Sequence, residues 1–467
     1  MTALGMHESF GETYFGVAEL GDVRRTRRLV QVADQLLAHP GGTLPTKIQS
    51  PGDLDALYRL ANRPEVTHQT VLAPVRDMTL TRIEDHPGTV LVLHDTTELD
   101  YTSLSSLKDE LGQIGDGGGR GYECHNSLAI DPRTKEVFGL TQQILHHRED
   151  VPKKESVTDR RERESRESRL WLQGTVGLPD QPRIVDVCDR AADTFEFLQH
   201  ELRSGRTFVI RSQHDRSMSP GHDTSAPRRR LHKFARSLPS LGTRSVEVGL
   251  REDRLARTAA LCVAVAAVSL HPPHVRRGEY QRAMAMPMYV VRVWEPNPPP
   301  GERPLEWMLL TNHPCVDFAG ACQAIGFYEK RWVIEELHKA MKTGLSIEEM
   351  QFTTTGALEP MIALFSTVAV ALLNLRAASR QPDAKTRKAT ELFSPHYVDV
   401  LCAWRHRELR PEWTIHDFFH ALARLGGHQN RKGDKQPGWL VLWRGWIKLQ
   451  SMREGADAMS QLRCGET

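Results

Sequence analysis

Short apolar runs that end in a carboxylate constrain the fold of this chain more than any other feature. The run Thr89–Asp95 reads Thr-Val-Leu-Val-Leu-His-Asp, and Pro182–Asp189 reads Pro-Arg-Ile-Val-Asp-Val-Cys-Asp. A continuous apolar run of this length is typical of a strand buried on both faces. Sites in open α/β sheets form at the carboxyl ends of strands, so Asp95 and Asp189 are candidate catalytic acids.

Further strand and helix patterns surround these two runs. Apolar periodicity and turn signals predict strands at Cys124–Ile130, Glu136–Leu145 and Thr207–Arg211, and helices at Asp159–Gly174 and Ala192–Leu202. The chain order is then three strands, a helix, a strand, a helix and a strand. This order predicts an α/β fold of the α+β type, with a mixed sheet and helices packed on it.

Residues 212 to about 316 interrupt this plan. The β-like runs Arg244–Leu250, Thr258–Leu270, Tyr289–Trp294 and Glu306–Leu310 predict an all-β insertion. The run Thr258–Leu270 is the most membrane-like stretch, but its 13 residues fall short of the about 20 that a spanning helix needs. We therefore expect a buried strand there, and no membrane partner.

Charge and cysteine content narrow the classes of function. The chain has 467 residues, enough for about three domains of roughly 150 residues. Its 61 Lys and Arg nearly balance 59 Asp and Glu, so any surface for a polyanion must be local. Residues 205–255 form such a region, with eleven Lys or Arg and five Asp or Glu. Seven cysteines without zinc spacing, and a start without an apolar leader, predict reduced thiols in a cytoplasmic protein.

Both ends of the chain have helical periodicity. The first seventy residues predict a small helical module with one basic edge, formed by Arg24, Arg25, Arg27 and Arg28. These arginines can grip phosphates or can form an ordinary solvated helix face. The sequence after about residue 365 is helical again and holds five of the nine tryptophans, which predicts packing between helices or subunits.

The segment Gly326–Lys342 is the most informative for function. At about 100° per residue, four polar side chains of one expected helix fall within about 60° of each other. These side chains are Tyr328, Arg331, Glu335 and Lys342. The opposite face is apolar, and we expect it to pack on the sheet. It consists of Val333, Ile334, Leu337, Ala340 and Met341.

Two interpretations of this helix stay open on its own pattern. In an ordinary amphipathic helix, Arg331 and Glu335 form an i,i+4 ion pair of about 0.2 to 0.5 kcal/mol. In the other, Glu335 joins Asp95 and Asp189, because three carboxylates can hold two divalent cations that promote phosphodiester chemistry. Cationic side chains beside Glu335 would then bind the phosphate under attack.

Several motifs occur in an order that is specific to one family. They are His94-Asp-Thr-Thr-Glu-Leu99, Val187-Cys-Asp-Arg-Ala-Ala-Asp193, Phe208-Val-Ile-Arg-Ser212, Trp307-Met-Leu-Leu-Thr311, and Tyr328–Gly344 with the spacing Y-x-x-R-x-x-x-E-x-x-x-x-x-x-K. Further matching segments are Leu20–Leu29 and Leu422–Gly427, with Trp439, Trp443 and Trp446, so the matching positions are spread over nearly the whole chain. In these motifs the chain resembles the Tn-five-like DDE transposases of the IS-four insertion-sequence family.

The resemblance implies a fold and a catalytic centre. The implied core is ribonuclease-H-like at residues 71–365, with its β-rich insertion at about 212–316. A helical DNA-binding domain at 1–70 precedes it, and a helical C-terminal dimerisation domain at 366–467 follows it. Asp95, Asp189 and Glu335 would be the catalytic residues and the ligands of two Mg²⁺ ions per active site, for which Mn²⁺ can substitute.

DNA contacts are implied for a second set of residues. By resemblance, Tyr328, Arg331 and Lys342 hold the phosphate of a flipped-out base, and Trp307 stacks on that base. The other expected DNA contacts are Arg211, Lys339, Arg24, Arg25, Arg27 and Arg28. Arg211 can equally be structural, and Trp307 can equally belong to the core of the insertion.

Other residues compete for these roles. Asp186 and Asp193 lie close to Asp189 in the sequence, and the Cys-Asp-Arg motif selects Asp189. His338 lies near the polar stripe, but no second His or Cys stands at ligand spacing, so we do not expect it to bind metal. Ala191 stands where close relatives carry a glutamate.

The implied function is cut-and-paste DNA transposition. The expected partners are double-stranded DNA, both transposon terminal inverted repeats and target, and a second copy of the chain in a synaptic homodimer. The expected location is the bacterial cytoplasm, with the nucleoid when bound to DNA. Two other functions stay open: a catalytically silent DNA-binding or inhibitory relative, and a general metal-dependent DNA nuclease.

Overall fold

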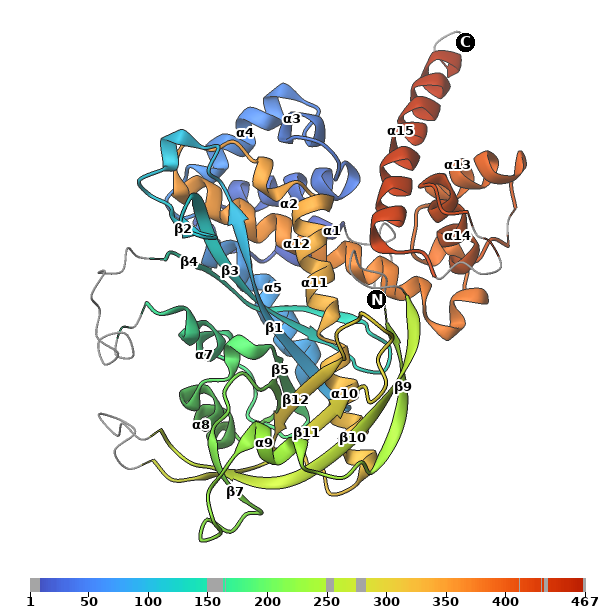
Figure 1. Cartoon of the computed structure of the whole chain (residues 1–467). Coiled ribbons are helices and arrows are strands. Elements are labelled where there is room, and N and C mark those ends of the chain that lie inside the picture. The colour runs from blue at the N-terminus through green and yellow to red at the C-terminus, as the bar shows by residue number, and fades with distance from the viewer. Residues whose placement is uncertain are drawn as a thin grey trace.

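The chain folds around one large mixed sheet with helices packed around it and at its ends (Figure 1). This computed structural model describes residues 9–148, 163, 165–248, 256–273, 283–410, 412–429, 431 and 436–464. Within these ranges, twelve strands form the sheet in the order β2-β3-β1-β5-β6-β12-β11-β10-β7-β8, with β4 beside β3 and β9 beside β10. The predicted α/β fold with a mixed sheet is confirmed.

The half of the sheet that carries the predicted acids has mixed strand directions. β1 (Val90–Asp100) pairs antiparallel with β3 (Gly119–Ile130), which pairs with β4 (Val137–His146) and β2 (Gly112–Ile114). A short helix η1 (Ser105–Leu107) joins β1 to β2.

On its other side, β1 pairs in parallel with β5 (Ile184–Cys188), and β5 in parallel with β6 (Thr207–Arg211). The predicted strands are confirmed, but β1 does not end at Asp95. It continues to Asp100 because β3 remains its partner after the pairing with β5 stops.

The helices of this half are shorter than predicted. In place of the expected helix at Asp159–Gly174, the structure has η2 (Glu167–Arg169) and α7 (Leu170–Gly174), while residues 159–162 and 164 lie outside the described residues. The expected helix at Ala192–Leu202 is split into η3 (Arg190–Ala192) and α8 (Phe195–Ser204). The Thr194 side chain starts α8 by accepting a hydrogen bond from the backbone N–H of Phe197.

The insertion extends the sheet. Its elements are β7 (Ser217–Pro220), β8 (Arg229–Arg230), α9 (Leu231–Arg236), β9 (Gly242–Val248), β10 (Arg257–Leu270), β11 (Met286–Trp294) and β12 (Glu306–Thr311). β12 pairs antiparallel with β6, with Leu309 opposite Arg211. The predicted strands are confirmed, but the all-β expectation was wrong at α9, where Leu231 and Ala235 bury one face of a helical turn.

The N-terminal helices form a separate layer beside the sheet (Figure 1). They are α1 (Phe10–Phe15), α2 (Val23–Ala38), α3 (Leu44–Lys47) and α4 (Pro51–Ala61), followed by α5 (His68–Asp85). Asp22 caps α2, whose buried face includes Leu29 and Leu36. The helical character predicted for this part is confirmed for the described residues.

The expected helix Gly326–Lys342 is not continuous. Instead, α10 (Phe318–Glu329) is followed by α11 (Trp332–Lys339) and a π-helical segment η5 (Ala340–Gly344). Between α10 and α11, the backbone N–H groups of Lys330, Arg331 and Val333 bond to the carbonyl three residues before them. This tighter spacing separates the two helices, so a wheel drawn through one ideal helix was wrong.

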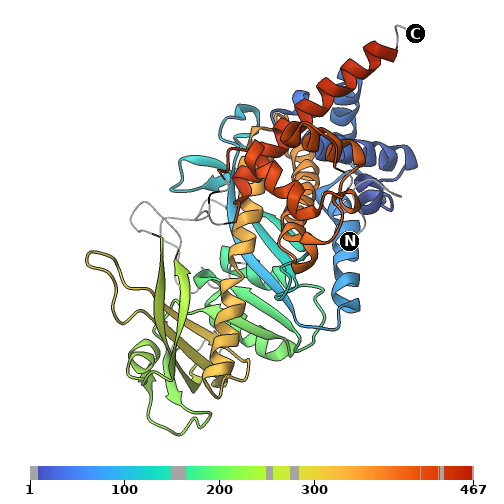
Figure 2. The same cartoon turned by 90° about the vertical axis from the view of Figure 1, so that its right-hand side faces the viewer.

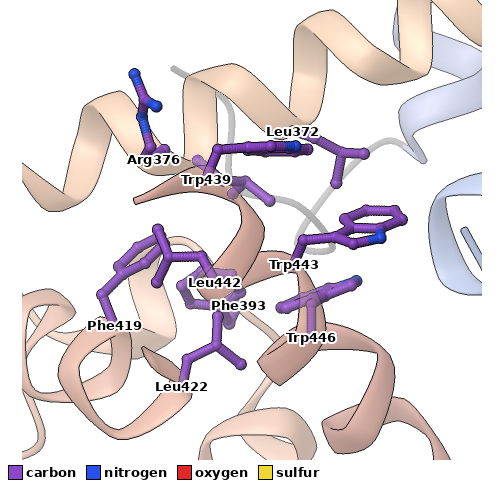
Figure 3. Close-up of a pocket in the computed structure, with 10 residues that line it drawn as sticks. Leu372, Arg376, Phe393, Phe419, Leu422, Trp439, Leu442, Trp443 and Trp446 are labelled. Atoms are coloured by element: carbon purple, nitrogen blue, oxygen red, sulfur yellow. The ribbon is translucent and has the colours of Figure 1, made fainter. Parts of the chain in front are cut away.

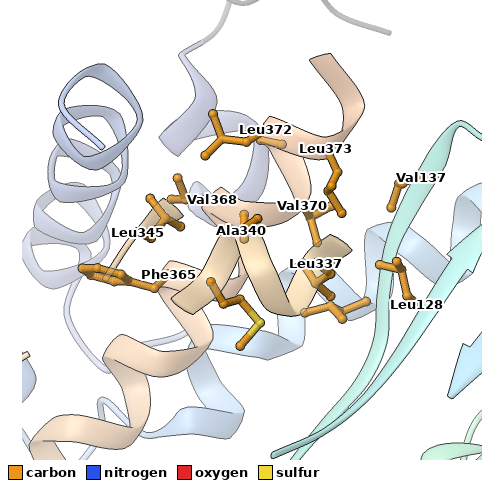
Figure 4. Close-up of a cluster of buried hydrophobic side chains, with 14 of the residues drawn as sticks. Leu128, Val137, Leu337, Ala340, Leu345, Phe365, Val368, Val370, Leu372 and Leu373 are labelled. Carbon is orange, nitrogen blue, oxygen red and sulfur yellow. The ribbon is translucent and has the colours of Figure 1, made fainter. Parts of the chain in front are cut away.

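The apolar face predicted for this segment is confirmed. Its five members, Val333, Ile334, Leu337, Ala340 and Met341, are buried. α11 packs on β1 and on α12 (Thr355–Ser379), which follows a short helix η6 (Ile347–Glu349). Figure 4 shows Leu337 and Ala340 facing side chains of α12 such as Val368 and Val370. This face therefore anchors α11 between the sheet and a core helix.

α12 is the most membrane-like element of the described chain, which corrects the expectation placed on Thr258–Leu270. It is long and apolar enough to cross a membrane, with a mean hydropathy of 1.8 over its most apolar window. However, 83% of that window is buried inside the protein. α12 contacts α5, β4 and α14, so its apolar residues form the protein core.

The C-terminal part is a helical group at the end of α12 (Figure 2). Its elements are η7 (Pro382–Lys385), η8 (Ala389–Glu391), α13 (Pro395–His406), α14 (Ile415–Leu425) and α15 (Trp439–Cys464). α12 runs through the expected domain boundary at 365/366, so that boundary does not coincide with the end of an element.

The tryptophans of this part pack between helices, as predicted. Trp439 and Trp443 stack with ring centroids 5.6 Å apart, and Trp446 stacks on Tyr397 at 5.3 Å. Figure 3 shows the small cavity, about 30 Å³, that these tryptophans line with Leu372 and Arg376 of α12. The aromatic cluster thus joins the C-terminal helices to the end of α12.

Candidate active site

Strand pairing sets two of the predicted acids side by side. His94 of β1 lies opposite Cys188 of β5 in the last pair of their parallel ladder. Asp95 and Asp189 are the residues that follow this pair on each strand. Asp189 also caps η3, because its carboxylate accepts the backbone N–H of Ala191 at 2.9 Å. Asp95 and Asp189 therefore lie next to each other at the point where the pairing of β1 with β5 ends.

Side-chain alternation decides which face of the sheet Asp95 occupies. Successive strand residues point to opposite faces, so Asp95 shares its face with Leu91 and Leu93. Both leucines belong to the same buried cluster as Leu337 of α11. Glu335 lies two residues before Leu337 on the helix that covers this face.

Arg331 connects the strand acid to the helix acid. Its Nη1 donates to Asp95 Oδ2 at 2.8 Å, and its Nη2 donates to Glu335 Oε1. Its side chain is only 18% exposed. Arg331 is the residue that caps α11, so the break between α10 and α11 places the guanidinium between the two carboxylates.

The electrostatics of the group reflect this crowding. Burial raises the pKa of Asp95 to about 6; Arg331 opposes the rise, while the charges of Asp189 and Glu335 add to it. Burial works to lower the pKa of Arg331, but the neighbouring carboxylates outweigh it and raise the pKa. The group therefore holds more negative charge than one arginine neutralises, which favours the binding of a further cation.

An open cavity of about 490 Å³ lies at this point. Asp95, Asp189 and Lys342 line it. Lys342 Nζ is 3.1 Å from Glu348, whose carboxylate also accepts the backbone N–H of Asp100 at 2.9 Å. A cationic and an acidic wall thus face the same space.

The donor set suits Mg²⁺ or Mn²⁺ in its chemistry, since carboxylate oxygens are the ligands that these cations prefer. As the side chains stand, however, the described residues contain no group of three or more His, Cys, Asp or Glu side chains arranged to hold a metal ion. Arg331 occupies the position between Asp95 and Glu335.

Asp186 and Asp193, the two acids that compete with Asp189, bind other partners inside the protein. Asp186 is fully buried and accepts hydrogen bonds from His94 at 2.7 Å and from Arg206 at 2.8 Å. Burial works to raise its pKa, but the hydrogen bond and charge of His94 and the charge of Arg206 lower it to about 2. Asp193 is buried against Arg216 and the backbone N–H groups of residues 213 and 214. Of the three candidates, the cavity exposes Asp189.

The residues expected to hold a flipped base are partly assembled. Trp307 of β12 and Tyr328 of α10 contact each other with ring centroids 5.8 Å apart. Trp307 is half-buried and Tyr328 is buried, so the Tyr328 side chain does not share an open polar stripe with Arg331. Tyr328 is therefore the buried member of the four polar groups, whereas Arg331, Glu335 and Lys342 are half-buried.

Two further predicted DNA contacts lie at different places. Arg211 ends β6, and its guanidinium donates to the backbone carbonyl of Glu306 at 3.3 Å. Lys339 is exposed on α11, with its Nζ 4.5 Å from the ring of Trp332, itself 43% exposed. The Arg211 contact is structural, whereas Lys339 and Trp332 present a cation and an aromatic ring to solvent.

The N-terminal arginines are mostly paired within their own domain. Arg24 pairs with Asp22, Arg25 with Glu65 and Arg28 with Asp53. In the part of the chain that the structure describes, only Arg27 of these four is exposed without an ion pair. The basic edge is present, but three of its charges are offset by carboxylates.

A second acidic wall of the cavity was not predicted from the sequence. Glu98 of β1 lies opposite Glu123 of β3, and Glu167 joins them at the cavity. Burial raises the pKa of Glu123 to about 7. The charges of Glu167 and Glu98 add to this rise, and the charge of Arg148 opposes it. Glu98 lies three positions after Asp95 on β1, so alternation places the two side chains on opposite faces of the sheet, and the pattern around Asp95 gave no signal for this wall.

A buried polar chain beneath α11 was not predicted either. His338 Nε2 lies 3.3 Å from the Asn126 amide, whose oxygen accepts a hydrogen bond from Gln143 at 2.7 Å. Burial, followed by the charges of Lys342 and Arg331, lowers the pKa of His338 to about 3. His338 is therefore neutral, and its contact with Asn126 helps to fix α11 on β3.

The fold and the site together define a mixed α/β protein that has an acid-lined cavity and a helical N-terminal part. Comparison with known families adds one finding. Residues 7–66, which include α1 to α4, match the family described as Transposase DNA-binding. The match supports a transposase, a DNA-processing enzyme with DNA as its partner.

Proposed function

We propose that this protein is a cut-and-paste transposase of the DDE type, similar to the Tn-five-like members of the IS-four family. The observation that carries the proposal is that Arg331 joins Asp95 to Glu335, while Asp95 lines one cavity together with Asp189 and Lys342. The transposase DNA-binding match in the same chain supplies the substrate class.

Asp95, Asp189 and Glu335 would hold two Mg²⁺ ions, or Mn²⁺ in their place. When bound, these ions would activate the attacking water or 3′ hydroxyl and stabilise the leaving oxygen. The side chains of the chain itself position the DNA: Lys342 meets the phosphodiester from one wall, and Arg331 is able to engage it from between the acids.

Successive reactions at one site would produce transposition. Water attacks the phosphodiester at the transposon end and frees a 3′ hydroxyl. That hydroxyl attacks the opposite strand to form a hairpin, water reopens the hairpin, and the 3′ hydroxyl then joins target DNA. Each step exchanges one oxygen at phosphorus for another, so one set of acids can serve all of them.

We further propose a ribonuclease-H-like core. Its support is the order of the elements, in which three antiparallel strands precede α7, β5, α8 and β6, and the parallel neighbours β1 and β5 carry the two acids. The long insertion then separates Asp189 from the helix of Glu335.

The proposed assembly is a synaptic homodimer in the bacterial cytoplasm, with the nucleoid when bound to DNA. The C-terminal helix α15 projects from the body of the chain (Figures 1 and 2), and its outer part leaves Met459 54% exposed. Beyond Asp457, which pairs with His396 of α13, the described end of α15 exposes Met459, and this exposed end suits contact with a second copy.

Purified protein with Mg²⁺ and DNA that carries its own terminal inverted repeat tests the function. We expect nicked and hairpin products from the wild type and none from Asp189→Asn or Glu335→Gln. Equal activity of wild type and variants would contradict the assignment of the acids.

Two other results would favour other functions. End binding without any metal-dependent cleavage would favour a silent DNA-binding relative. Equal cleavage of unrelated DNA without strand transfer would favour a general nuclease.

A further inference from the structure

Arg331 is an internal counter-ion of the acid group. Both ends of its guanidinium donate to carboxylates, one on β1 and one on α11. Its charge therefore neutralises the same Asp95 and Glu335 that would bind a divalent cation. A metal ion that enters the group must displace this arginine or bind with fewer carboxylate ligands.

The surroundings of Arg331 allow it to leave. It stands at the break between α10 and α11, where Asp95 and Glu335 are the side chains that hold it. A phosphodiester offers a guanidinium the same bidentate partner as a carboxylate does. Lys342, on the wall of the cavity that Asp95 also lines, would bring such a phosphate close to the guanidinium.

We propose that Arg331 is a gate that DNA opens: in the free protein it competes with the divalent cation, and a DNA phosphate draws it away from the acids. This inference rests on the proposed function. It makes DNA and metal bind with positive coupling, since each favours the state in which the carboxylates are released. The free protein would then carry little metal and would not cleave DNA before the end is seated.

Mn²⁺ binding to the full-length protein tests the gate without any use of activity. Electron paramagnetic resonance counts free Mn²⁺ during a titration, first without DNA and then with a pre-cleaved terminal-repeat duplex that ends in a 3′-deoxynucleotide. This duplex has already been cut and has no 3′ hydroxyl, so no reaction follows. For the wild type we expect affinity for Mn²⁺ to rise about tenfold or more when this DNA is present.

The Arg331→Gln variant should bind Mn²⁺ about tenfold or more tightly than the wild type without DNA, and DNA should change its affinity little. Arg257→Gln is the matched control, because Arg257 also bridges two carboxylates, Glu295 and Glu302, on the insertion. It should behave as the wild type does. Circular dichroism checks that each variant is folded.

Two results would overturn the gate. In one, Arg331→Gln binds Mn²⁺ no more tightly than the wild type, so that Arg331 holds the acids in place. In the other, wild-type affinity is the same with and without DNA. Asp95→Asn and Glu335→Gln separate this failure from failure of the proposed function, because Mn²⁺ binding that these variants leave unchanged would show that the metal site lies elsewhere.

Discussion

Among single residues, burial separates the carboxylates that hold the sheet together from those that face the cavity. Asp186 and Asp189 lie three positions apart at the end of β5. Asp186 is fully buried between His94 and Arg206, whereas Asp189 is half-buried and open to the cavity. The same type of side chain, an aspartate, thus stabilises the fold at position 186 and is accessible for chemistry at position 189.

Replacement of these two acids should lower stability by very different amounts. Asp186→Asn removes the buried carboxylate that bonds to both His94 and Arg206 and leaves Arg206 with Glu201 and Asp180, so we expect it to lower the free energy of unfolding by about 3 kcal/mol. Asp189→Asn should lower it by less than about 1 kcal/mol, because asparagine also caps η3. Urea unfolding followed by circular dichroism measures both. Equal losses would contradict the division between a structural and a cavity-facing acid.

His338 makes stability depend on pH. Its folded pKa of about 3 lies below its ordinary value of 6.5, so below pH 6.5 the unfolded chain binds the proton that the folded chain refuses. Stability is therefore lost as pH falls from 6.5 toward 3. At pH 5.5 we expect His338 to cost about 1.4 kcal/mol relative to pH 7.5.

The His338→Gln variant keeps a hydrogen-bonding side chain but does not titrate, so it should lack this loss. Urea unfolding at pH 7.5 and 5.5 measures the difference. His222→Gln, at an exposed histidine, should retain the wild-type dependence. A variant that loses as much stability in acid as the wild type would contradict the role of His338.

At the scale of elements, strands were predicted well and helix continuity was not. Burial on both faces leaves a mark in the sequence at Val90–His94 and Ile184–Cys188, because every position must be apolar or paired. The break at Lys330–Arg331 leaves no such mark. The break accompanies the contact of Arg331 with Asp95, and these two residues lie 236 positions apart in the sequence.

The candidate site was predictable to a similar extent. Strand ends and the polar residues near Glu335 indicated the acids, because each signal is local. The Arg331 contact depends on how α11 packs on β1, and the second acidic wall at Glu98 and Glu123 depends on strand pairing; spacing in the sequence reveals neither.

The edge strand β8 bears on DNA binding. Arg228, Arg229 and Arg230 are exposed at the end of the sheet, beyond the long insertion strands. If this edge contacts DNA, replacement of the three by glutamine should flatten the slope of log affinity against log salt by about one unit for each lost phosphate contact. Fluorescence anisotropy with terminal-repeat DNA at several salt concentrations measures the slope.

A matched control neutralises exposed arginines elsewhere, at Arg405 and Arg407 of the C-terminal part. The control should keep the wild-type slope. An unchanged slope in the β8 variant would assign these arginines to the solvated surface instead.

For the whole molecule, α12 is the element that the parts share. It contacts α2 and α4 of the N-terminal layer, β4 of the sheet and α14 of the C-terminal group. The predicted domain boundary fell inside this helix because helical periodicity returns in the sequence at about residue 365. Buried contacts on all sides explain why it is apolar enough to resemble a membrane helix.

Because this one helix contacts the N-terminal layer, the sheet and the C-terminal group, it sets the spacing between them. An α-helix of 25 residues is about 37 Å long and does not stretch. Under the proposed function, the distance along DNA between the sequence that is recognised and the bond that is cut would be set by this skeleton. This distance along the DNA would then be fixed by the protein fold. Substitutions at DNA-contacting side chains would leave it unaltered.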